Sequence, residues 1–324
     1  MSELDSEHIC RVVIVGGGTA GLTVANDLEH AGVNFVLLER REVFDPQVGA
    51  SLGLLPNASR ILDQVGCYEK FLEITKPIRK QTVHRADGTL FAEYKCLFGI
   101  SASIDGMEVG ENYKTFAKDV STLSYIGMIG RVFWFVFVKM DKVYYTPNIP
   151  RFTTADADAL VEEVGSLAIR EKRRVTVRDL YRERISGNLV ALEEAEYDHW
   201  SWGRLVCLGD AIHKMTPNLG AGGSSAIESA AVLSNIISGL VNGVGKPTVE
   251  AIRLALGSYQ KLRAIRMTKV LKVANVLTRL QALKGWKEYA MTHFIAPRAD
   301  GVFTRNVFEF LDRSPSGRLS TQTS

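Results

Sequence analysis

The stretch VVIVGGGTAGLTVANDLEHAGVNFVLLER, Val12 to Arg40, decides the fold. Four β-branched residues come first, followed by a glycine-rich turn, a helical segment and a second apolar run. This order predicts a βαβ unit with two parallel strands. The turn contains Gly16, Gly18 and Gly21 at the spacing G-x-G-x-x-G, which is typical of a turn that holds phosphate groups.

Each of these glycines meets a separate steric requirement. Gly16 permits the tight turn, Gly18 lets the backbone approach a pyrophosphate, and Gly21 lets helix and strand pack closely. The helix N-terminus then directs free N–H groups at the phosphates. Glu39 ends the second strand, eighteen residues after Gly21, where a carboxylate can accept both ribose hydroxyls and disfavours a 2′-phosphate. The stretch therefore predicts a nucleotide of the FAD or NAD type. A glycine-rich turn of another α/β fold, the alternative, leaves Glu39 unexplained.

The composition narrows the class of protein. The 324 residues are 46% hydrophobic and 23% charged, as in ordinary globular proteins. A net charge of +3 gives no case for nucleic-acid binding. The four cysteines lack any C-x-x-C spacing, so we predict no metal site. Isolated thiols fit a reducing compartment, and the polar N-terminal residues lack a signal-peptide pattern, so we expect a cytoplasmic location.

The middle of the chain predicts a sheet followed by helices. Residues 94–150 are rich in β-branched and aromatic residues. Their most apolar run, 125–140, is interrupted by Arg131, which favours two buried strands over a membrane span. A hairpin is predicted just before this block, with its turn at Asp87-Gly88. Residues 153–186 are predicted to be mostly helical.

A second glycine-rich segment, GRLVCLGDAIHKMTPNLGAGGSSAIESAAVL from Gly203 to Leu233, decides between FAD and NAD. A strand should precede Asp210, whose carboxylate can accept a ribityl hydroxyl. The loop at Gly220 to Ser224 leads into a helix, and its positive N-terminus would stabilise the negative charge of a reduced flavin. An NAD enzyme needs no second contact segment so far along the chain, so FAD is predicted. His213 fits a structural histidine better than a catalytic one.

Residues 247–288 carry apolar residues at helical spacing together with many Lys and Arg residues. A helix with a solvated basic face is the simpler interpretation, because long Lys and Arg stems commonly cover apolar surface. A peripheral contact with a membrane through the same face is the alternative.

Four segments carry a family resemblance: GGGTAG, LLERR, GASLGLLPNASRILDQVG and LGDAIHKMTPNLGAGGSSAIESAA. Together they resemble the FAD-dependent monooxygenases of the aromatic-hydroxylase-like (group A) family. The segments YKCLFGIS, GRVFWFVFVKMDKVYY and NIPRFTTADADALVE are similar to its fungal branch, which oxidises meroterpenoid and indole-diterpene intermediates. The resemblance implies that Glu39 holds the adenosine ribose and that Asp210 holds the ribityl chain. It also places Gly53 against the cofactor, and Gly220 and Gly223 at the second loop.

The resemblance further implies a fold and a reaction. The fold would be a Rossmann-like, doubly wound α/β FAD-binding domain, with an inserted β-sheet substrate region and a helical C-terminal segment. We predict the FAD domain in 1–92 and 199–245, the substrate region in 93–198, and the helical segment and tail in 246–324. A monomer would use NADPH or NADH and O2 to oxygenate a lipophilic small molecule, by epoxidation of a prenyl chain. No catalytic residue is predicted, because the cofactor carries the chemistry.

The sequence departs from the family pattern in two places. RADGTLFAEY runs directly into KCLFGIS, where the family has a helix, several strands and an Asp-Gly motif that contacts FAD. The loss should remove strands of the nucleotide-binding sheet and one wall of the FAD site, and should leave apolar faces to be covered in another way. In the second loop, Ala221 and Ser224 replace two amide side chains of the family pattern. The alternatives are therefore a catalytically impaired flavoprotein remnant, which includes a chain that no longer binds flavin, and a ring hydroxylase of the same family.

Overall fold

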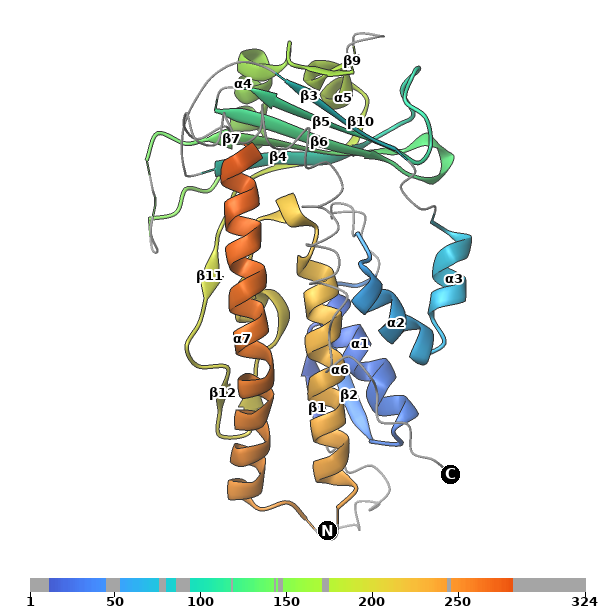
Figure 1. Ribbon diagram of the computed structural model, residues 1–324, viewed down its shortest axis with the longest axis vertical. Helices are drawn as coiled ribbons and strands as arrows, with labels where there is room; N and C mark the ends of the chain where they lie inside the picture. The colour runs from blue at the N-terminus through green and yellow to red at the C-terminus, as the bar shows by residue number, and fades with distance from the viewer. Residues whose placement is uncertain are drawn as a thin grey trace, which may run out of the picture.

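The computed structural model describes residues 12–44, 53–75, 80–85, 94–117, 119–142, 144, 148–170, 175–243 and 246–281. A broad sheet with two short helices on its outer face lies at one end of the molecule (Figure 1). Two long helices, α6 (Gly222–Val241) and α7 (Val249–Gln281), run side by side below the opposite face of this sheet. The smaller N-terminal unit packs beside α6.

The N-terminal unit is the predicted βαβ unit. The strands β1 (Val12–Val15) and β2 (Phe35–Leu38) are parallel, and α1 (Thr19–His30) connects them. Ile14 of β1 and Leu28 of α1 lie in one buried cluster with Ala230 of α6. This cluster joins the first helix of the chain to α6, so the two halves of the predicted FAD domain pack against each other.

The other face of β1 and β2 is apolar and uncovered by the described residues. The outward-pointing side chains have exposed fractions between 44% and 83%, and they are Val13, Val15, Val36 and Leu38. The α/β class is confirmed, but a doubly wound sheet carries helices on both faces. The described residues form only a two-stranded sheet here, covered on one side. This is the uncovered apolar face expected from the loss of the middle stretch.

The second sheet has six strands in the order β10-β4-β7-β6-β5-β3. These strands are β3 (Lys80–Arg85), β4 (Tyr94–Ser101), β5 (Glu111–Ala117), β6 (Val120–Ile126), β7 (Val132–Lys139) and β10 (Arg184–Ala191). All neighbours are antiparallel except β3 and β5, which are parallel. The apolar run 125–140 thus contains the end of β6 and all of β7. The first strand of the predicted hairpin is β3, but β3 pairs with β5 and not with the strand that follows it. The predicted turn at Asp87-Gly88 lies outside the described residues.

Two helices cover one face of this sheet. They are α4 (Thr154–Val164) and α5 (Val177–Arg182). Leu160 of α4 and Leu180 of α5 lie in one buried cluster with Trp134 of β7. The cluster identifies the covered face of the sheet, so side chains at alternate positions point to the opposite face, toward α6 and α7 (Figure 1).

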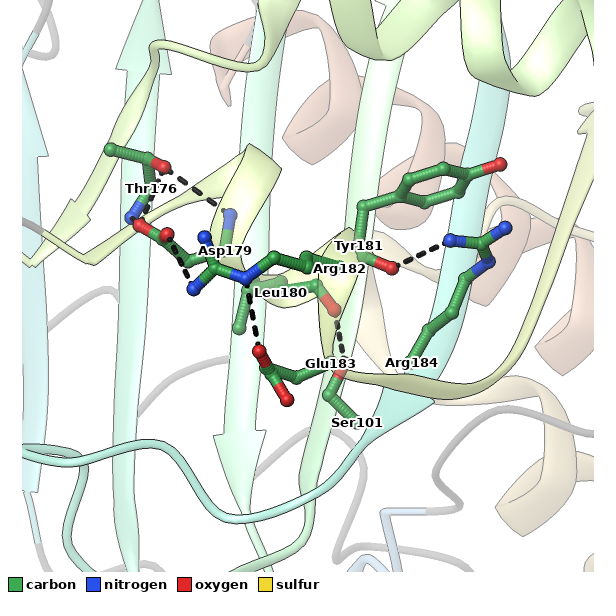
Figure 2. A network of polar contacts seen from close by, with 8 residues as sticks. All are labelled: Ser101, Thr176, Asp179, Leu180, Tyr181, Arg182, Glu183 and Arg184. Atoms are coloured by element: carbon green, nitrogen blue, oxygen red, sulfur yellow. Dashed lines mark hydrogen bonds and ion pairs between the residues drawn. The ribbon is translucent and has the colours of Figure 1, made fainter.

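Figure 2 shows how α5 is fixed to the sheet. The hydroxyl of Ser101, at the end of β4, donates to the carbonyl of Leu180 over 2.6 Å. The same oxygen accepts a hydrogen bond from Trp134 Nε1 over 2.7 Å. Thr176 and Asp179 form a capping box at the first turn of α5. The short helix is therefore held by its own cap and by one buried hydroxyl group.

The remaining elements are short, apart from the 9-residue α2. They are α2 (Pro56–Gln64), α3 (Tyr68–Glu73), β8 (Ala168–Arg170), β9 (Val175–Thr176), β11 (Ala195–Glu196), β12 (Ser201–Trp202), β13 (Leu205–Val206), β14 (His213–Lys214) and the single 3-10 turns η2 (Met128–Gly130), η3 (Gly209–Ala211) and η4 (Pro217–Leu219). The strand predicted before Asp210 is reduced to β13, which pairs with β12 alone. The predicted second helix begins at Gly222, after η4.

By length and composition alone, α6 could cross a membrane. However, 61% of its most apolar window is buried inside the protein. The helix packs against α1, α2 and α7. Its apolar character is therefore explained by its place at the centre of the helical layer.

Lysine substitutions at two neighbouring positions of β1 test whether only one face of the β1–β2 sheet is covered. Val15 is 83% exposed and Ile14 is 8% exposed. We expect Val15→Lys to change the free energy of unfolding by less than about 0.5 kcal/mol and to weaken binding of the dye ANS. We expect Ile14→Lys to cost roughly 3 kcal/mol or more, because it buries an unpaired charge. Urea unfolding measures both, and equal losses would contradict the assignment of the two faces.

Candidate functional site

The fold brings the two glycine-rich segments together. Gly209, in η3, has φ +64° and lies between the first turns of α1 and α6. A Cβ atom at Gly209 would lie 3.5 Å from the Cβ atoms of both Ala20 and Ala226. Segments almost two hundred residues apart therefore meet at one place, as a shared nucleotide site requires.

The first loop has the geometry that its glycines predict. Gly16 has φ +107°, a conformation that favours glycine, and its N–H donates to the Leu38 carbonyl over 2.7 Å. A Cβ atom at Gly21 would lie 2.0 Å from the Gly16 carbonyl oxygen. Beside Gly18 no other atom lies within 4 Å of the position of a Cβ. The loop thus packs tightly on the strand side and is open at Gly18.

Glu39 is held against this loop. Its Oε2 accepts a hydrogen bond from the Gly17 N–H over 2.7 Å, and its Oε1 accepts one from the Arg41 N–H over 2.9 Å. These two backbone donors lower the pKa of Glu39, so its carboxylate stays anionic at neutral pH. Gly17 is a site residue that the sequence analysis missed. Gly17 could have been identified from the sequence, because it lies between Gly16 and Gly18 in the run of three glycines.

The second loop contacts the segment before α2. The hydroxyl of Ser224 donates to the Gly53 carbonyl over 3.2 Å and accepts from the Leu55 N–H over 3.1 Å. A Cβ at Gly53 would lie 3.9 Å from the carbonyl oxygen of Gly220, which itself has φ +67°. Gly223 lies in the first turn of α6. The serine that replaces a family amide thus joins Gly53 to the second loop.

The predicted site residues therefore form two groups. Around the first loop lie Gly16, Gly18, Gly21 and Glu39, and around the second lie Gly53, Gly220 and Gly223. Asp210, in η3, is exposed. It follows Gly209, the residue between the two groups, so its carboxylate is available to a ligand at that point.

The helices of the site differ from the outer helices in their N-terminal caps. Thr153 and Thr176 cap α4 and α5 with their side chains. By contrast, the N-caps of α1 and α6 are Gly18 and Ala221, with no side-chain cap hydrogen bond. The first N–H groups of a helix need acceptors, and anions supply them. Two such ends, of which the first has the anionic Glu39 beside it, fit a dinucleotide with a pyrophosphate and an electron-accepting ring.

The helix α7 holds the second loop in place. Hydrogen bonds join Thr278 to Thr216 over 2.7 Å and Gln281 to Asn218 over 2.8 Å. Nearer its middle, α7 donates from Arg263 Nη2 to the carbonyl oxygen of Ser225 over 3.3 Å. The loop that leads into α6 is therefore fixed by a helix more than thirty residues later in the chain.

A buried ion-pair cluster was missed by the sequence analysis. Glu228 Oε1 of α6 lies 2.6 Å from Arg263 Nη1 and 2.8 Å from Arg266 Nε. Its other oxygen accepts from Asn57 Nδ2 of α2 over 3.0 Å. Of these two basic residues of α7, Arg263 is fully buried and Arg266 keeps a 12% exposed side chain, so neither lies on a fully solvated face. The sequence did offer a sign of this cluster, because Arg263 lies at helical spacing on the same buried stripe of α7 as four core residues. These are Leu256, Tyr259, Met267 and Val270.

His213 occupies a structural position beside this cluster. Its ring is buried, lies 3.4 Å from the Ser229 hydroxyl and packs on the Trp200 ring at 5.8 Å between centroids. Burial lowers the pKa of His213 to about 4, so the imidazole is neutral at physiological pH. A neutral, packed imidazole agrees with the structural interpretation of this residue.

Residues 9–116 and 162–274 match the model of a protein family described as FAD binding domain. The chain belongs to the family of FAD binding domains. All eight predicted cofactor-binding positions lie within the matched ranges. The FAD cofactor predicted from the second glycine segment is therefore the cofactor of the family.

Curated relatives extend the comparison. The FAD-dependent monooxygenase verC1 of Penicillium polonicum is 34% identical, over 89% of this chain and 49% of its own length. The FAD-dependent monooxygenase adrH of Penicillium rubens is 28% identical, over 96% of this chain and 87% of its own. This chain spans about half the length of verC1. The alignment with verC1 has 394 positions, so verC1 carries internal residues without a counterpart among these 324.

Solved structures share the fold. Klebsiella pneumoniae HpxO, complexed with FAD and uric acid, is 14% identical with a TM-score of 0.71, over 97% of this chain and 100% of that chain. A salicylate hydroxylase substrate complex is 15% identical with a TM-score of 0.63, over 94% of this chain and 98% of that chain. At these identities the likeness establishes the arrangement of the chain and nothing of its chemistry.

Two glycines in helices test the close approach of α1 to its loop. We expect Gly21→Ala to cost about 1–3 kcal/mol, because the new methyl group overlaps the Gly16 carbonyl. The control is Gly239→Ala in α6, where no other atom lies within 4 Å of the position of a Cβ. We expect it to stabilise by about 0.5–1 kcal/mol, as alanine does in helices. Thermal unfolding of the cofactor-free chain compares them, and a neutral Gly21→Ala would argue against the tight loop.

Asp27 provides a pH-dependent test of the contact between α1 and α6. Burial raises the pKa of Asp27 from 3.8 to about 7, although the Ser234 hydroxyl of α6 and the charge of His30 partly oppose the shift. The folded chain therefore binds more protons than the unfolded chain between these two values. This contribution is present at low pH and is lost as the pH rises from about 4 to about 7.

We expect Asp27→Asn to remove this pH dependence, because an amide resembles the protonated carboxyl group. Relative to the unchanged chain, the variant should gain stability as the pH rises, on the order of 2–4 kcal/mol by pH 8. Urea unfolding at pH 5, 6.5 and 8 measures the difference. A constant difference across this range would show that Asp27 titrates normally.

Proposed function

We propose that this chain binds FAD and is an NAD(P)H- and O2-dependent monooxygenase that acts on a lipophilic secondary-metabolite intermediate. The single observation that carries the proposal is the pair of helix N-termini without side-chain caps that meet at Gly209, with the anionic Glu39 held beside the first of them. Membership of the FAD binding domain family supports the cofactor. The reaction is supported by similarity to verC1 and adrH, which are named FAD-dependent monooxygenases.

Each end of the cofactor has residues of this chain to hold it. Glu39 would accept the ribose hydroxyls of the adenosine, and the first turn of α1 would bind the pyrophosphate. Asp210 would accept a ribityl hydroxyl. The first turn of α6 would face the electron-accepting end of the flavin ring, where its positive end stabilises added negative charge. When bound, FAD supplies the redox and oxygen chemistry.

The substrate side would be the sheet face opposite α4 and α5. It carries Phe98, Tyr125 and Phe135, whereas Trp134 belongs to the covered face. An apolar face of this kind would hold a lipophilic molecule and exclude water. Epoxidation of a prenyl chain is the finer proposal, and it rests on the sequence resemblance to the fungal branch.

A second candidate is an impaired flavoprotein that holds FAD without turnover. The two-stranded β1–β2 sheet and its uncovered outer face favour it. The internal residues that verC1 has and this chain lacks favour it too. Ring hydroxylation by an intact enzyme is the third candidate, and the chemical structure of the oxygenated product would distinguish it from epoxidation.

The deciding experiment is an absorbance spectrum of the purified chain reconstituted with FAD, followed by NADPH or NADH addition under air. A flavin band that bleaches and then recovers supports the monooxygenase. A bound flavin that never bleaches supports the impaired flavoprotein. A colourless chain that cannot be reconstituted overturns FAD binding altogether.

Two substitutions test the cofactor residues. We expect Glu39→Ala to raise the Kd for FAD by roughly 10- to 100-fold, because the ribose hydroxyls lose a charged acceptor. Asp210→Ala should weaken binding by a smaller factor, about threefold to tenfold, since it removes a contact at the exposed η3 turn. The control is Glu42→Ala, an exposed carboxylate on the same segment as Glu39. Titration of FAD fluorescence measures all three, and unchanged FAD retention in both site variants would refute the assignment.

A further inference from the structure

The sheet face toward α6 and α7 contains one lysine in its interior. Lys114 of β5 is directly opposite Leu123 of β6. Leu123 in turn is opposite Phe135 of β7, and Phe135 is opposite Phe98 of β4. Residues directly opposite each other in antiparallel strands share a face. Lys114 therefore lies in one row with Leu123, Phe135 and Phe98, on the face that we propose for the substrate.

The ammonium group of Lys114 has no counter-ion within the described part of the chain. No hydrogen bond or ion pair to it is formed by those residues. Burial alone lowers the pKa of Lys114 to about 8, and no neighbouring charge contributes. Holding a cation against apolar side chains without an anion is unfavourable. Such a group is retained at a cost to stability, which points to a use in binding.

Two further polar side chains lie on the same face. Asn112, two residues before Lys114 on β5, is 2% exposed, and its Oδ1 has no hydrogen-bond partner among the described residues. Asn112 is directly opposite Tyr125 of β6. Burial raises the pKa of Tyr125 to about 12, so its phenol keeps its proton. An amide, an ammonium and a phenol thus lie in neighbouring rows of this face, beside its aromatic and aliphatic residues.

We propose that Asn112, Lys114 and Tyr125 form the polar end of the substrate site, and that the substrate is an apolar molecule with one anionic oxygen, such as a carboxylate or an enolate. The ammonium pairs with that oxygen and the phenol donates to it, while the amide of Asn112 can donate from Nδ2 and its unpartnered Oδ1 can accept from a hydroxyl group of the substrate. The aromatic residues of the same rows contact the apolar remainder. This inference rests on the proposed function for its location, and it adds the charge of the substrate.

A structural explanation of Lys114 makes a different prediction. A lysine can lay its stem along apolar side chains and extend its ammonium to water. In that case the charge would contribute nothing to ligand selection. A pair of probes with the same shape but different charge separates the two explanations.

The probes are 2-naphthoate and 2-naphthamide, measured by calorimetry on the full chain with FAD added. We expect the unchanged chain to bind the acid at least tenfold more tightly than the amide. Lys114→Met should raise the Kd of the acid by roughly 10- to 100-fold, the range for a lost hydrogen bond to a charged group. It should leave the amide unaffected. The same variant should unfold at a higher temperature, because it removes a half-buried charge that has no counter-ion among the described residues.

The control is Lys95→Met, the same chemical change on β4. Lys95 is opposite Val138 on the covered face, with its ammonium over the Phe152 ring. It should keep the preference for the acid, and Lys114→Arg should keep most of it. Equal binding of the two probes by the unchanged chain, or an unchanged preference in Lys114→Met, would overturn the inference. The flavin spectrum of the same samples reports FAD binding separately, so a failure of the proposed function is seen independently.

Discussion

The buried carboxylate of Glu228 joins three helices behind the two glycine loops. It lies on α6, pairs with two arginines of α7 and accepts a hydrogen bond from Asn57 of α2. Removing one partner from such a cluster leaves a buried charge uncompensated, which typically costs about 3–5 kcal/mol. Both glycine loops are positioned relative to α6, so their geometry depends on this cluster. The cofactor-binding surface is thus set by contacts made well behind it.

The amino-acid sequence predicted those site residues whose role depends on the backbone conformation or packing of their own segment. Gly16 and Gly21 were identified because a positive φ and a close approach each admit only glycine, and Glu39 because it ends the next strand. The Glu228 cluster, the pairing of β3 with β5 and the row of Lys114 were not predicted. They depend on register and on helix rotation between segments far apart in the chain, which no local pattern encodes. The doubly wound sheet of the family is incomplete among the described residues, as the missing middle stretch led us to expect.

The helices differ in how their first N–H groups are satisfied, and α2 and α3, like α1 and α6, have no side-chain cap. Outer helices α4 and α5 satisfy their first N–H groups with a threonine and an aspartate of their own. The helices α1 and α6 forgo that stabilisation, usually about 1 kcal/mol for each cap. Lys114 is a similar case on the sheet, a charge kept where an apolar residue would pack better. Stability is given up at these places where a ligand could make the missing contact.

The order of segments along the chain has a consequence for biosynthesis. The strands from β4 to β10 come from the continuous stretch 94–191, and most of their pairings are between near neighbours, so this sheet can form while later residues are still being made. The cofactor-binding half cannot form so early, because β1 packs on α6, which is made later. The second loop likewise needs its hydrogen bonds to Thr278 and Gln281 near the end of α7. Until α6 is made, the face of the βαβ unit that packs on α6 has no partner within the nascent chain. Free FAD in the cell would meet a competent site only after almost the whole described chain has emerged.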